Sequence, residues 1–235
     1  MKLSHLMRYF KKKLMNERIE LIINDLSYQD QKIVLFGVGG VGGTALEALV
    51  RSGFKTIDIY DFDVIDESNL NRQVITNSQN IGLTKVDEAA SFAKKINSNL
   101  IIKAFNKKIT KENIDDIDLS NVGFIIDAID DVEAKVAIIK KAKELNIKII
   151  SSMGTGNKLN PQLLEIVDIN QTSYCPLAKI MRRLLKDEGI NHVPVIYSKE
   201  QREAKGHKVG TMMFVPSTAG LLIVSYIVRV LIGEL

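Results

Sequence analysis

The sequence predicts an α/β fold in which a doubly wound, mostly parallel sheet carries helices on both faces, with a small antiparallel extension. Short apolar runs, such as residues 33–36 and 122–126, alternate with longer segments of helical periodicity. These runs are continuously apolar, as strands buried on both faces are. A glycine-rich turn joins the first run to the first helix of the alternating series. We therefore expect a parallel sheet with a helical layer on either side.

The elements follow one another in a regular order. The segment up to residue 26 is predicted as a helix, and a short helical piece follows Thr110. Further strands are expected at 33–36, 56–60, 100–105, 122–126, 147–151, 163–167 and 193–197, and further helices at 44–51, 82–96, 132–145 and 175–187. The strand at 163–167 lies outside the parallel series. The polar run 198–208 is expected to be a mobile loop. Pro216 divides the apolar C-terminal stretch into a short strand and a buried helix that begins at Ser217 or Thr218.

Length and composition indicate one domain. The chain has 235 residues, of which 46% are hydrophobic, so it can bury one substantial core. We expect a nucleotide-binding core at about 30–152 and a substrate or dimer region at about 153–235. The net charge of +4 is compatible with a polyanionic partner without requiring one. The single cysteine, Cys175, rules out an internal disulfide and a thiolate zinc cage. A reducing cytoplasm is the expected location, with peripheral membrane contact through the C-terminal helix as an alternative.

The turn between the first apolar strand and the next helix has the pattern GxGGxG. Its glycines are Gly37, Gly39, Gly40 and Gly42. A strand, a glycine turn and a helix in this order direct backbone N–H groups and the positive end of the helix dipole at one point. Because glycine has no Cβ, a ligand can approach the main chain closely. The turn therefore predicts a phosphate-binding site.

Polar and charged residues follow the second strand. Asp61 ends that strand about 20 residues beyond the turn, where a carboxylate can accept hydrogen bonds from a ribose. Asp63, Asn69 and Arg72 lie in the loop that follows, and Lys85 begins the next helix. A hydride-transfer site needs an apolar shelf for a nicotinamide ring, whereas converging arginine and lysine side chains suit a triphosphate. These residues favour ATP, although the turn and Asp61 alone would also fit a dinucleotide-binding oxidoreductase.

Asp130 is the predicted magnesium ligand. It follows the strand at 122–126, beside the expected position of the phosphates. One carboxylate there can hold a magnesium ion that also contacts phosphate oxygens. The alternative role for Asp130 is to cap the following helix, but Asp131 is the last residue before the apolar helical pattern and suits that role better.

Taken together, these motifs resemble those of the adenylating enzymes related to ubiquitin-activating enzymes, which include the molybdopterin-synthase and thiamine-pathway adenylyltransferases. The glycine turn is followed by DFD, SNLNRQ, GLTK and a strand ending in DAIDD. The resemblance implies roles for seven residues: Gly40 and Asp61 at the adenosine, Asn69 and Arg72 at the phosphates, Lys85 at the reacting phosphate, Asp130 at magnesium, and Arg18, from the RIELI segment, in the active site of the other subunit of a homodimer.

The remainder of the chain is similar to the tRNA threonylcarbamoyladenosine dehydratases. The similarity lies in IISSMGTGNKLNPQLLEIVDINQTSYCPLAK, VIYSKE and GTMMFVPSTAGL. It implies ATP-driven cyclisation of threonylcarbamoyladenosine in tRNA through an acyl-adenylate, with ATP and Mg²⁺ but no zinc. The partners implied are tRNA and a second copy of the chain, and a sulfur-transfer protein is a further candidate. The alternative from the wider group is an adenylyltransferase that activates the C-terminus of a ubiquitin-like or sulfur-carrier protein, with Cys175 as a candidate acceptor.

Overall fold

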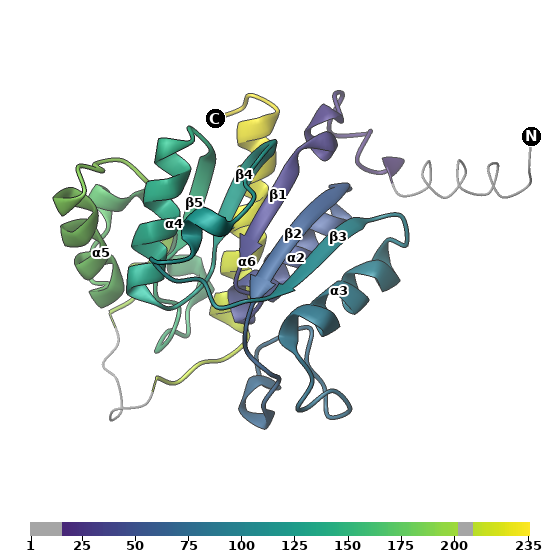
Figure 1. Ribbon diagram of the computed structural model, residues 1–235, viewed down its shortest axis with the longest axis horizontal. Helices are drawn as coiled ribbons and strands as arrows, with labels where there is room; N and C mark the ends of the chain where they lie inside the picture. Colours follow the sequence, from purple (N-terminus) through teal and green to yellow (C-terminus); the bar gives the residue numbers. More distant parts are fainter. Residues whose placement is uncertain (1–15, 202–208) are drawn as a thin grey trace, which may run out of the picture.

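The protein is built around one twisted sheet with helices on both faces (Figure 1). The computed structural model describes residues 16–201 and 209–235. Within them the sheet has seven strands in the order β3-β2-β1-β4-β5-β7-β6. The strands are β1 (Lys32–Phe36), β2 (Thr56–Asp61), β3 (Ile101–Asn106), β4 (Val122–Asp127), β5 (Lys148–Ser152), β6 (Leu164–Asp168) and β7 (Pro194–Ser198). Neighbouring strands are parallel except for the pair β6 and β7, which is antiparallel. The predicted fold class and its antiparallel extension are confirmed.

Two hydrophobic cores lie on opposite faces of this sheet, because successive side chains of a strand point to opposite sides. In β1, Ile33 and Leu35 belong to one core, and Val34 and Phe36 to the other. The helices are α2 (Gly40–Arg51), α3 (Lys85–Ile96), α4 (Val132–Glu144), α5 (Pro176–Asp187) and α6 (Phe214–Leu231). Buried residues of α2, α3 and α6 contribute to the first core, and those of α4 and α5 to the second.

The segment before β1 differs from its predicted helix. Most of that prediction lies outside the described residues. Asn16 is helical and residues 17–22 form turns, with the last helical hydrogen bond running from the Ile23 amide to the Ile19 carbonyl. A 3-10 helix, Ser27–Asp30, then leads into β1. The prediction of one continuous helix to residue 26 is therefore too long at its C-terminal end.

The strand predicted before Pro216 is wrong, because α6 already begins at Phe214. Pro216 lies in the first helical turn, where backbone N–H groups have no partner within the helix, so its missing N–H costs nothing. By length and composition α6 could cross a membrane, which is weak evidence because core helices pass the same test. The predicted mobile loop at 198–208 lies largely outside the described residues.

Candidate active site

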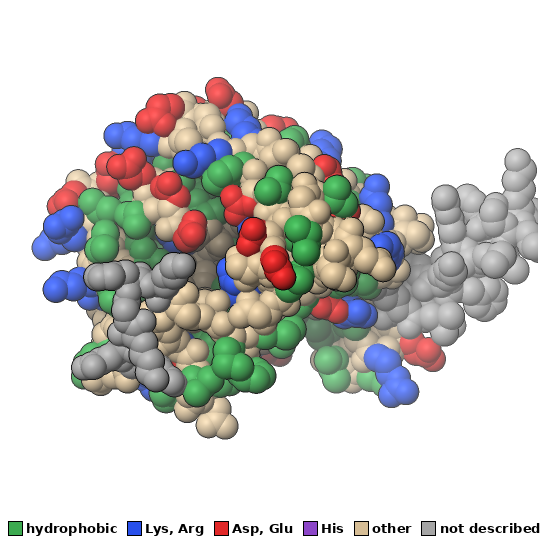
Figure 2. Space-filling model, turned by 90° about the horizontal axis from the view of Figure 1, so that it is seen from below, with side chains coloured by type: hydrophobic (Ala, Val, Ile, Leu, Met, Phe, Trp, Pro, Cys, Tyr) green, Lys and Arg blue, Asp and Glu red, His purple; other side chains and the backbone are tan. Residues whose placement is uncertain are grey.

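A cavity of about 1070 Å³ opens where the parallel strands end. Its walls come from the segments that follow β1, β2, β3, β4 and β5, which share one edge because these strands are parallel. Figure 2 shows the molecule from this side, with a hollow near the centre of the face. The lining includes these predicted residues: Gly37, Gly39, Gly40, Asp61, Asp63, Asn69, Arg72, Lys85 and Asp130. Residues predicted at separate strand ends are thus brought together.

The glycine turn brings backbone close to backbone at the base of this cavity. Gly37 has a φ of 87°, a conformation that favours glycine, and a Cβ there would lie 2.7 Å from the Ala128 carbonyl oxygen. A Cβ on Gly42 would lie 1.9 Å from the Gly37 carbonyl oxygen. Gly42 therefore permits close packing of α2 and does not itself line the cavity. Helix α2 begins at Gly40 without a side-chain cap, so its N-terminus offers backbone donors to an anion.

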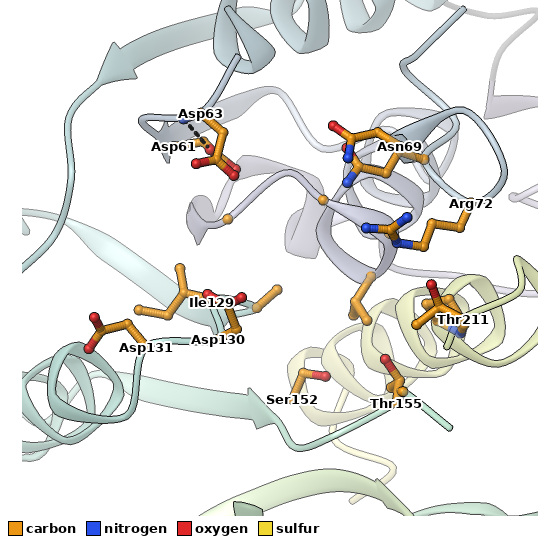
Figure 3. Close-up of a pocket in the computed structure, with 18 of the residues that line it drawn as sticks. Asp61, Asp63, Asn69, Arg72, Ile129, Asp130, Asp131, Ser152, Thr155 and Thr211 are labelled. Carbon is orange, nitrogen blue, oxygen red and sulfur yellow. Dashed lines mark hydrogen bonds between the residues drawn. The ribbon is translucent and has the colours of Figure 1, made fainter. Parts of the chain in front are cut away.

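Asp61 is fixed by the backbone on both sides of its carboxylate. One oxygen accepts a hydrogen bond from the Val38 amide at 2.8 Å, and the other from the Asp63 amide at 2.9 Å. The second bond is drawn in Figure 3. A carboxylate oxygen has two lone pairs, so each can accept a further bond from a ligand. The orientation of Asp61 is set before any ribose arrives.

Lys85 lies against Asp63 on the same side of the cavity. Its ammonium is 2.6 Å from the Asp63 carboxylate. The lysine side chain is only 7% exposed, whereas Asp63 is 47% exposed. Because an ammonium has three donors, Lys85 can keep this contact while directing another N–H at a phosphate. The ion pair holds the lysine in place.

Arg72 extends into the cavity from a loop that fixes its position (Figure 3). Its Nη1 donates to the Ser68 carbonyl at 2.6 Å and to the side chain of Asn71 at 3.0 Å. The side-chain oxygen of Asn69 accepts from the Asp66 amide and so caps the short helix Glu67–Asn69. The neighbouring Gln73 is buried, and its amide oxygen has no hydrogen-bond partner among the described residues. Such an unmatched polar atom fits a lining meant for a polar ligand.

Asp130 and Asp131 have different surroundings. An Asp131 oxygen accepts from the Ala134 amide at 3.0 Å and caps α4. Asp130 is exposed, and its carboxylate has no partner among the described residues (Figure 3). Among those residues no group of three or more acidic, histidine or cysteine side chains could hold a metal. Magnesium needs only one or two carboxylates when phosphates supply its other ligands, so Asp130 fits that ion.

A fully buried ion pair lies beneath the segment that contains Asp130. The Lys135 ammonium is 2.9 Å from an Asp127 oxygen, and both side chains have no exposed surface. The Ser151 hydroxyl donates to the same oxygen, while the other Asp127 oxygen is 3.4 Å from the Ile129 amide. This cluster joins β4, β5 and α4 directly under the residues that lead to Asp130. Sequence reasoning placed Asp127 at the strand end but missed Lys135.

The wall beside Asp61 was also missed. It includes Tyr60, Phe62, Lys108 and Ile109. The Lys108 ammonium lies 5.4 Å from the centre of the Phe62 ring. Burial, together with the nearby negative charges of Asp58 and Asp118, raises the pKa of Tyr60 to about 12. The adjacent lysines 107 and 108 directly follow β3, so the rule that ligands meet strand ends could have found them.

Two other predicted residues are not part of the cavity within a single chain. Arg18 is exposed and lies outside the lining. Cys175 is only 5% exposed and packs in the core that α4 and α5 cover. Its sulfur would lie 3.6 Å from a Cβ placed on Gly154. The thiol is therefore shielded behind the cavity wall.

Comparison with known proteins finds one matching family and several solved structures with a similar fold. Residues 22–234 match the sequence model of the ThiF family. The tRNA threonylcarbamoyladenosine dehydratase of Bacillus subtilis (strain 168) is 33% identical over 226 residues, which cover 88% of this chain and 89% of that protein. The structure of the E. coli tRNA N6-threonylcarbamoyladenosine dehydratase with AMP has a TM-score of 0.84 and 28% identity over 88% of each chain. The same enzyme with ATP gives 0.86 and 26%, over 99% of this chain and 97% of that chain.

Proposed function

This chain belongs to the ThiF family, and on that premise we propose that it is an ATP-dependent dehydratase that cyclises N6-threonylcarbamoyladenosine in tRNA. The observation that carries the proposal is the single cavity in which the glycine turn, Asp61, Arg72 and Lys85 meet. The fold of the chain matches structures of the E. coli tRNA N6-threonylcarbamoyladenosine dehydratase in complex with ATP and with AMP.

The nucleotide would lie across the strand ends. Asp61 accepts from the ribose, with the adenine beside Tyr60, Phe62 and Ile109. The phosphates lie over the N-terminus of α2, within reach of Arg72. Asn69 supports this loop through its side-chain oxygen, and its amide nitrogen, which has no hydrogen-bond partner among the described residues, would donate to a phosphate oxygen.

In the activation step, a carboxylate oxygen of the threonyl group attacks the α-phosphorus of ATP. The bond from that phosphorus to the bridging oxygen breaks, and pyrophosphate leaves. Arg72 and Lys85 lie where the phosphate charge grows, and donors that are already positioned stabilise such charge without reorganisation. The product is an acyl-adenylate. Its AMP is a good leaving group, whereas the oxygen of the free carboxylate is a poor one.

Asp130 would hold Mg²⁺, which neutralises phosphate charge when bound. The chain contributes the exposed carboxylate of Asp130, and the backbone at this residue is fixed from two sides. On one side Asp131 caps α4, and on the other the Asp127–Lys135 pair supports the end of β4. Asp130 is therefore held toward the cavity although its carboxylate has no hydrogen-bond or ion-pair partner among the described residues.

Ring closure needs no protein nucleophile. The ureido group of the same substrate attacks the activated carbonyl, the bond to AMP breaks, and a proton is lost from the ureido group. Because the attacking group is tethered, proximity supplies on the order of 7 kcal/mol or more. The buried position of Cys175 agrees with a route that bypasses a thioester.

Arg18 would complete the site from a second copy of the chain. Within one chain it is exposed and outside the cavity, yet the segment that follows it leads directly to β1 and the glycine turn. A homodimer would bring Arg18 to the partner's phosphates. We place the enzyme in the cytoplasm with its tRNA and ATP, with α6 available for peripheral membrane contact. No feature of the described residues supports a sulfur-transfer partner, so none is proposed.

The test is mass spectrometry of tRNA nucleosides after incubation with the protein, ATP and Mg²⁺. We expect threonylcarbamoyladenosine to lose one water, and AMP and pyrophosphate to form in equal amounts. An ATP analogue with a methylene group between the α- and β-phosphates should block the reaction. Pyrophosphate exchange that is stimulated by a ubiquitin-like or sulfur-carrier protein, and not by modified tRNA, would instead favour a carrier-protein activator.

A further inference from the structure

The cavity has a second wall opposite the nucleotide residues, and the activation mechanism leaves it without a role. It consists of residues 152–156, Leu177 and residues 209–211, which we call the acyl wall. We infer that the acyl wall binds the hydroxyethyl side chain of the threonyl group, and that Thr155 and Thr211 determine specificity for it. This inference rests on the proposed function, because it assigns the side chain of the same substrate.

The two halves of the acyl wall are packed and hydrogen-bonded to each other. A Cβ on Gly156 would lie 2.2 Å from a Val209 methyl carbon and 3.7 Å from the Thr211 methyl carbon. The Asn157 amide donates to the Gly210 carbonyl at 2.7 Å, and the Gly210 amide donates back to the Asn157 side chain at 2.8 Å. The wall is thus a defined surface formed by two distant segments.

Its position relative to the phosphates is also fixed. The Asn71 side chain donates to the Thr211 carbonyl at 2.9 Å and accepts from Arg72 at 3.0 Å. Asn71 therefore links Thr211 by hydrogen bonds to the arginine that would contact the phosphates. A group joined to the α-phosphate through a carboxyl would therefore have this wall beside its side chain.

The chemistry of the acyl wall suits a short side chain with one hydroxyl and one methyl group. Thr155 and Thr211 are half-buried, and their hydroxyls have no hydrogen-bond partner among the described residues. Met153, Leu177 and Val209 supply apolar surface next to them. Figure 3 shows Thr155 and Ser152 on one side of the cavity and Thr211 on the side of Arg72. A site built to hydrogen-bond a substrate hydroxyl rejects an analogue that lacks it, because its polar groups are left unpaired.

The experiment compares two tRNA substrates that share the carboxylate and the ureido group. One carries threonylcarbamoyladenosine, and the other carries the glycyl analogue, which lacks the hydroxyethyl group. We expect the unaltered protein to prefer the threonyl substrate in kcat/KM. The double variant Thr155→Val and Thr211→Val should lose roughly 10-fold to 100-fold in kcat/KM for the threonyl substrate and little for the glycyl one.

Three controls make this result decisive. Thr56→Val, in β2 and away from the cavity, should leave the preference unchanged. Thr155→Ser and Thr211→Ser restore the hydroxyls and should restore most of the preference. ATP affinity, measured by titration calorimetry, should be the same in the double variant.

Three results would overturn the inference. If the double variant keeps the full preference, or loses activity on both substrates together with ATP affinity, the acyl wall does not read the side chain although the dehydratase function stands. If the unaltered protein dehydrates neither substrate, the proposed function fails and the inference fails with it.

Discussion

Asn71 donates its side-chain amide to the carbonyl oxygen of Thr211 at 2.9 Å, across 140 positions of the sequence. The same side chain accepts a hydrogen bond from the Arg72 guanidinium at 3.0 Å. One short polar residue thus connects the loop that follows β2 with the segment that leads into α6. Because Arg72 faces the expected phosphates and Thr211 belongs to the acyl wall, Asn71 sets the distance between the two halves of the site.

Replacing Asn71 should separate the effect on tRNA turnover from the effect on ATP binding. For Asn71→Ala we expect kcat/KM for tRNA to fall about 10-fold, since the lost bonds are worth on the order of 1 to 2 kcal/mol. Asn71→Asp keeps the acceptor for Arg72 and loses the donor to Thr211, so it should show a similar loss with ATP affinity preserved. Steady-state kinetics with tRNA and calorimetry with ATP measure the two quantities. Unchanged kinetics in both variants would contradict a positioning role.

The sequence allowed most of the fold and one side of the site to be predicted. Continuous apolar runs predicted strands buried on both faces, and β1, β2, β4 and β5 are such strands. Since parallel strands end at one edge, the polar residues after them had to meet there. That rule placed Asp61, Arg72 and Asp130 in one cavity, where the structure has them.

Residues 153–156 of the opposite wall follow the same rule, but residues 209–211 could not be predicted in this way. Hydrogen bonds to Asn71 and Asn157 hold residues 209–211 at the cavity, and no periodic pattern marks contacts between residues so far apart. The Asp127–Lys135 pair was hidden because lysine side chains normally face solvent, whereas Lys135 lies on the same buried face of α4 as Ile138, Ile139 and Ala142. Pro216 was misread as a helix boundary because a proline in the first helical turn and one just before a helix give the same local pattern.

The Lys85–Asp63 pair predicts an unequal response to loss of either partner. Lys85→Met removes a donor at the reacting phosphate, so kcat should fall by about 100-fold or more. Asp63→Asn keeps the lysine and an acceptor beside it, so we expect a loss of less than about 10-fold. Single-turnover kinetics of AMP formation give both values. Equal losses would show that the ion pair, and not the lysine charge, is what the reaction requires.

The neighbouring Asp130 and Asp131 form a matched pair for testing the magnesium site. Asp130→Ala should abolish turnover at ordinary Mg²⁺ concentrations while leaving thermal stability unchanged, because the carboxylate has no partner among the described residues. Asp131→Ala should lower the free energy of unfolding by about 1 kcal/mol through loss of the α4 cap, with Mg²⁺ dependence unaffected. Magnesium titrations of activity and chemical denaturation separate the two. A shifted Mg²⁺ dependence in the Asp131 variant alone would reverse the assignment.

The buried pair of Lys135 and Asp127 predicts a large effect on stability. Lys135→Met leaves an unpaired buried carboxylate and should cost about 3–5 kcal/mol in the free energy of unfolding. The double change of Lys135→Met with Asp127→Asn removes both charges and should cost less than the single change. Urea denaturation followed by circular dichroism measures both. Equal losses would mean that packing of the lysine stem, and not its charge, supports the end of β4.

A test of Arg18 follows from its exposed position outside the cavity of its own chain. If it acts in the partner's site, Arg18→Ala and Asp130→Ala should each abolish activity as pure homodimers. A mixed dimer of the two contains one complete site, made of Asp130 from the first subunit and Arg18 from the second. Mixing the inactive variants after mild dissociation should therefore restore up to about a quarter of the activity of the unaltered protein, because half of the dimers are mixed and each holds one of two sites.

The same experiment has its own control. An Arg18→Ala, Asp130→Ala double variant mixed with the unaltered protein places both defects on one chain, so its mixed dimers have no complete site when Arg18 acts across the interface. If Arg18 instead served its own chain, those mixed dimers would keep one site, and the two single variants would stay inactive when mixed. Dehydration of modified tRNA is measured after native mass spectrometry has verified subunit exchange. If Arg18 acts across the interface, only the mixture of the two single variants contains active mixed dimers. If Arg18 serves its own chain, only the mixture with the double variant contains them.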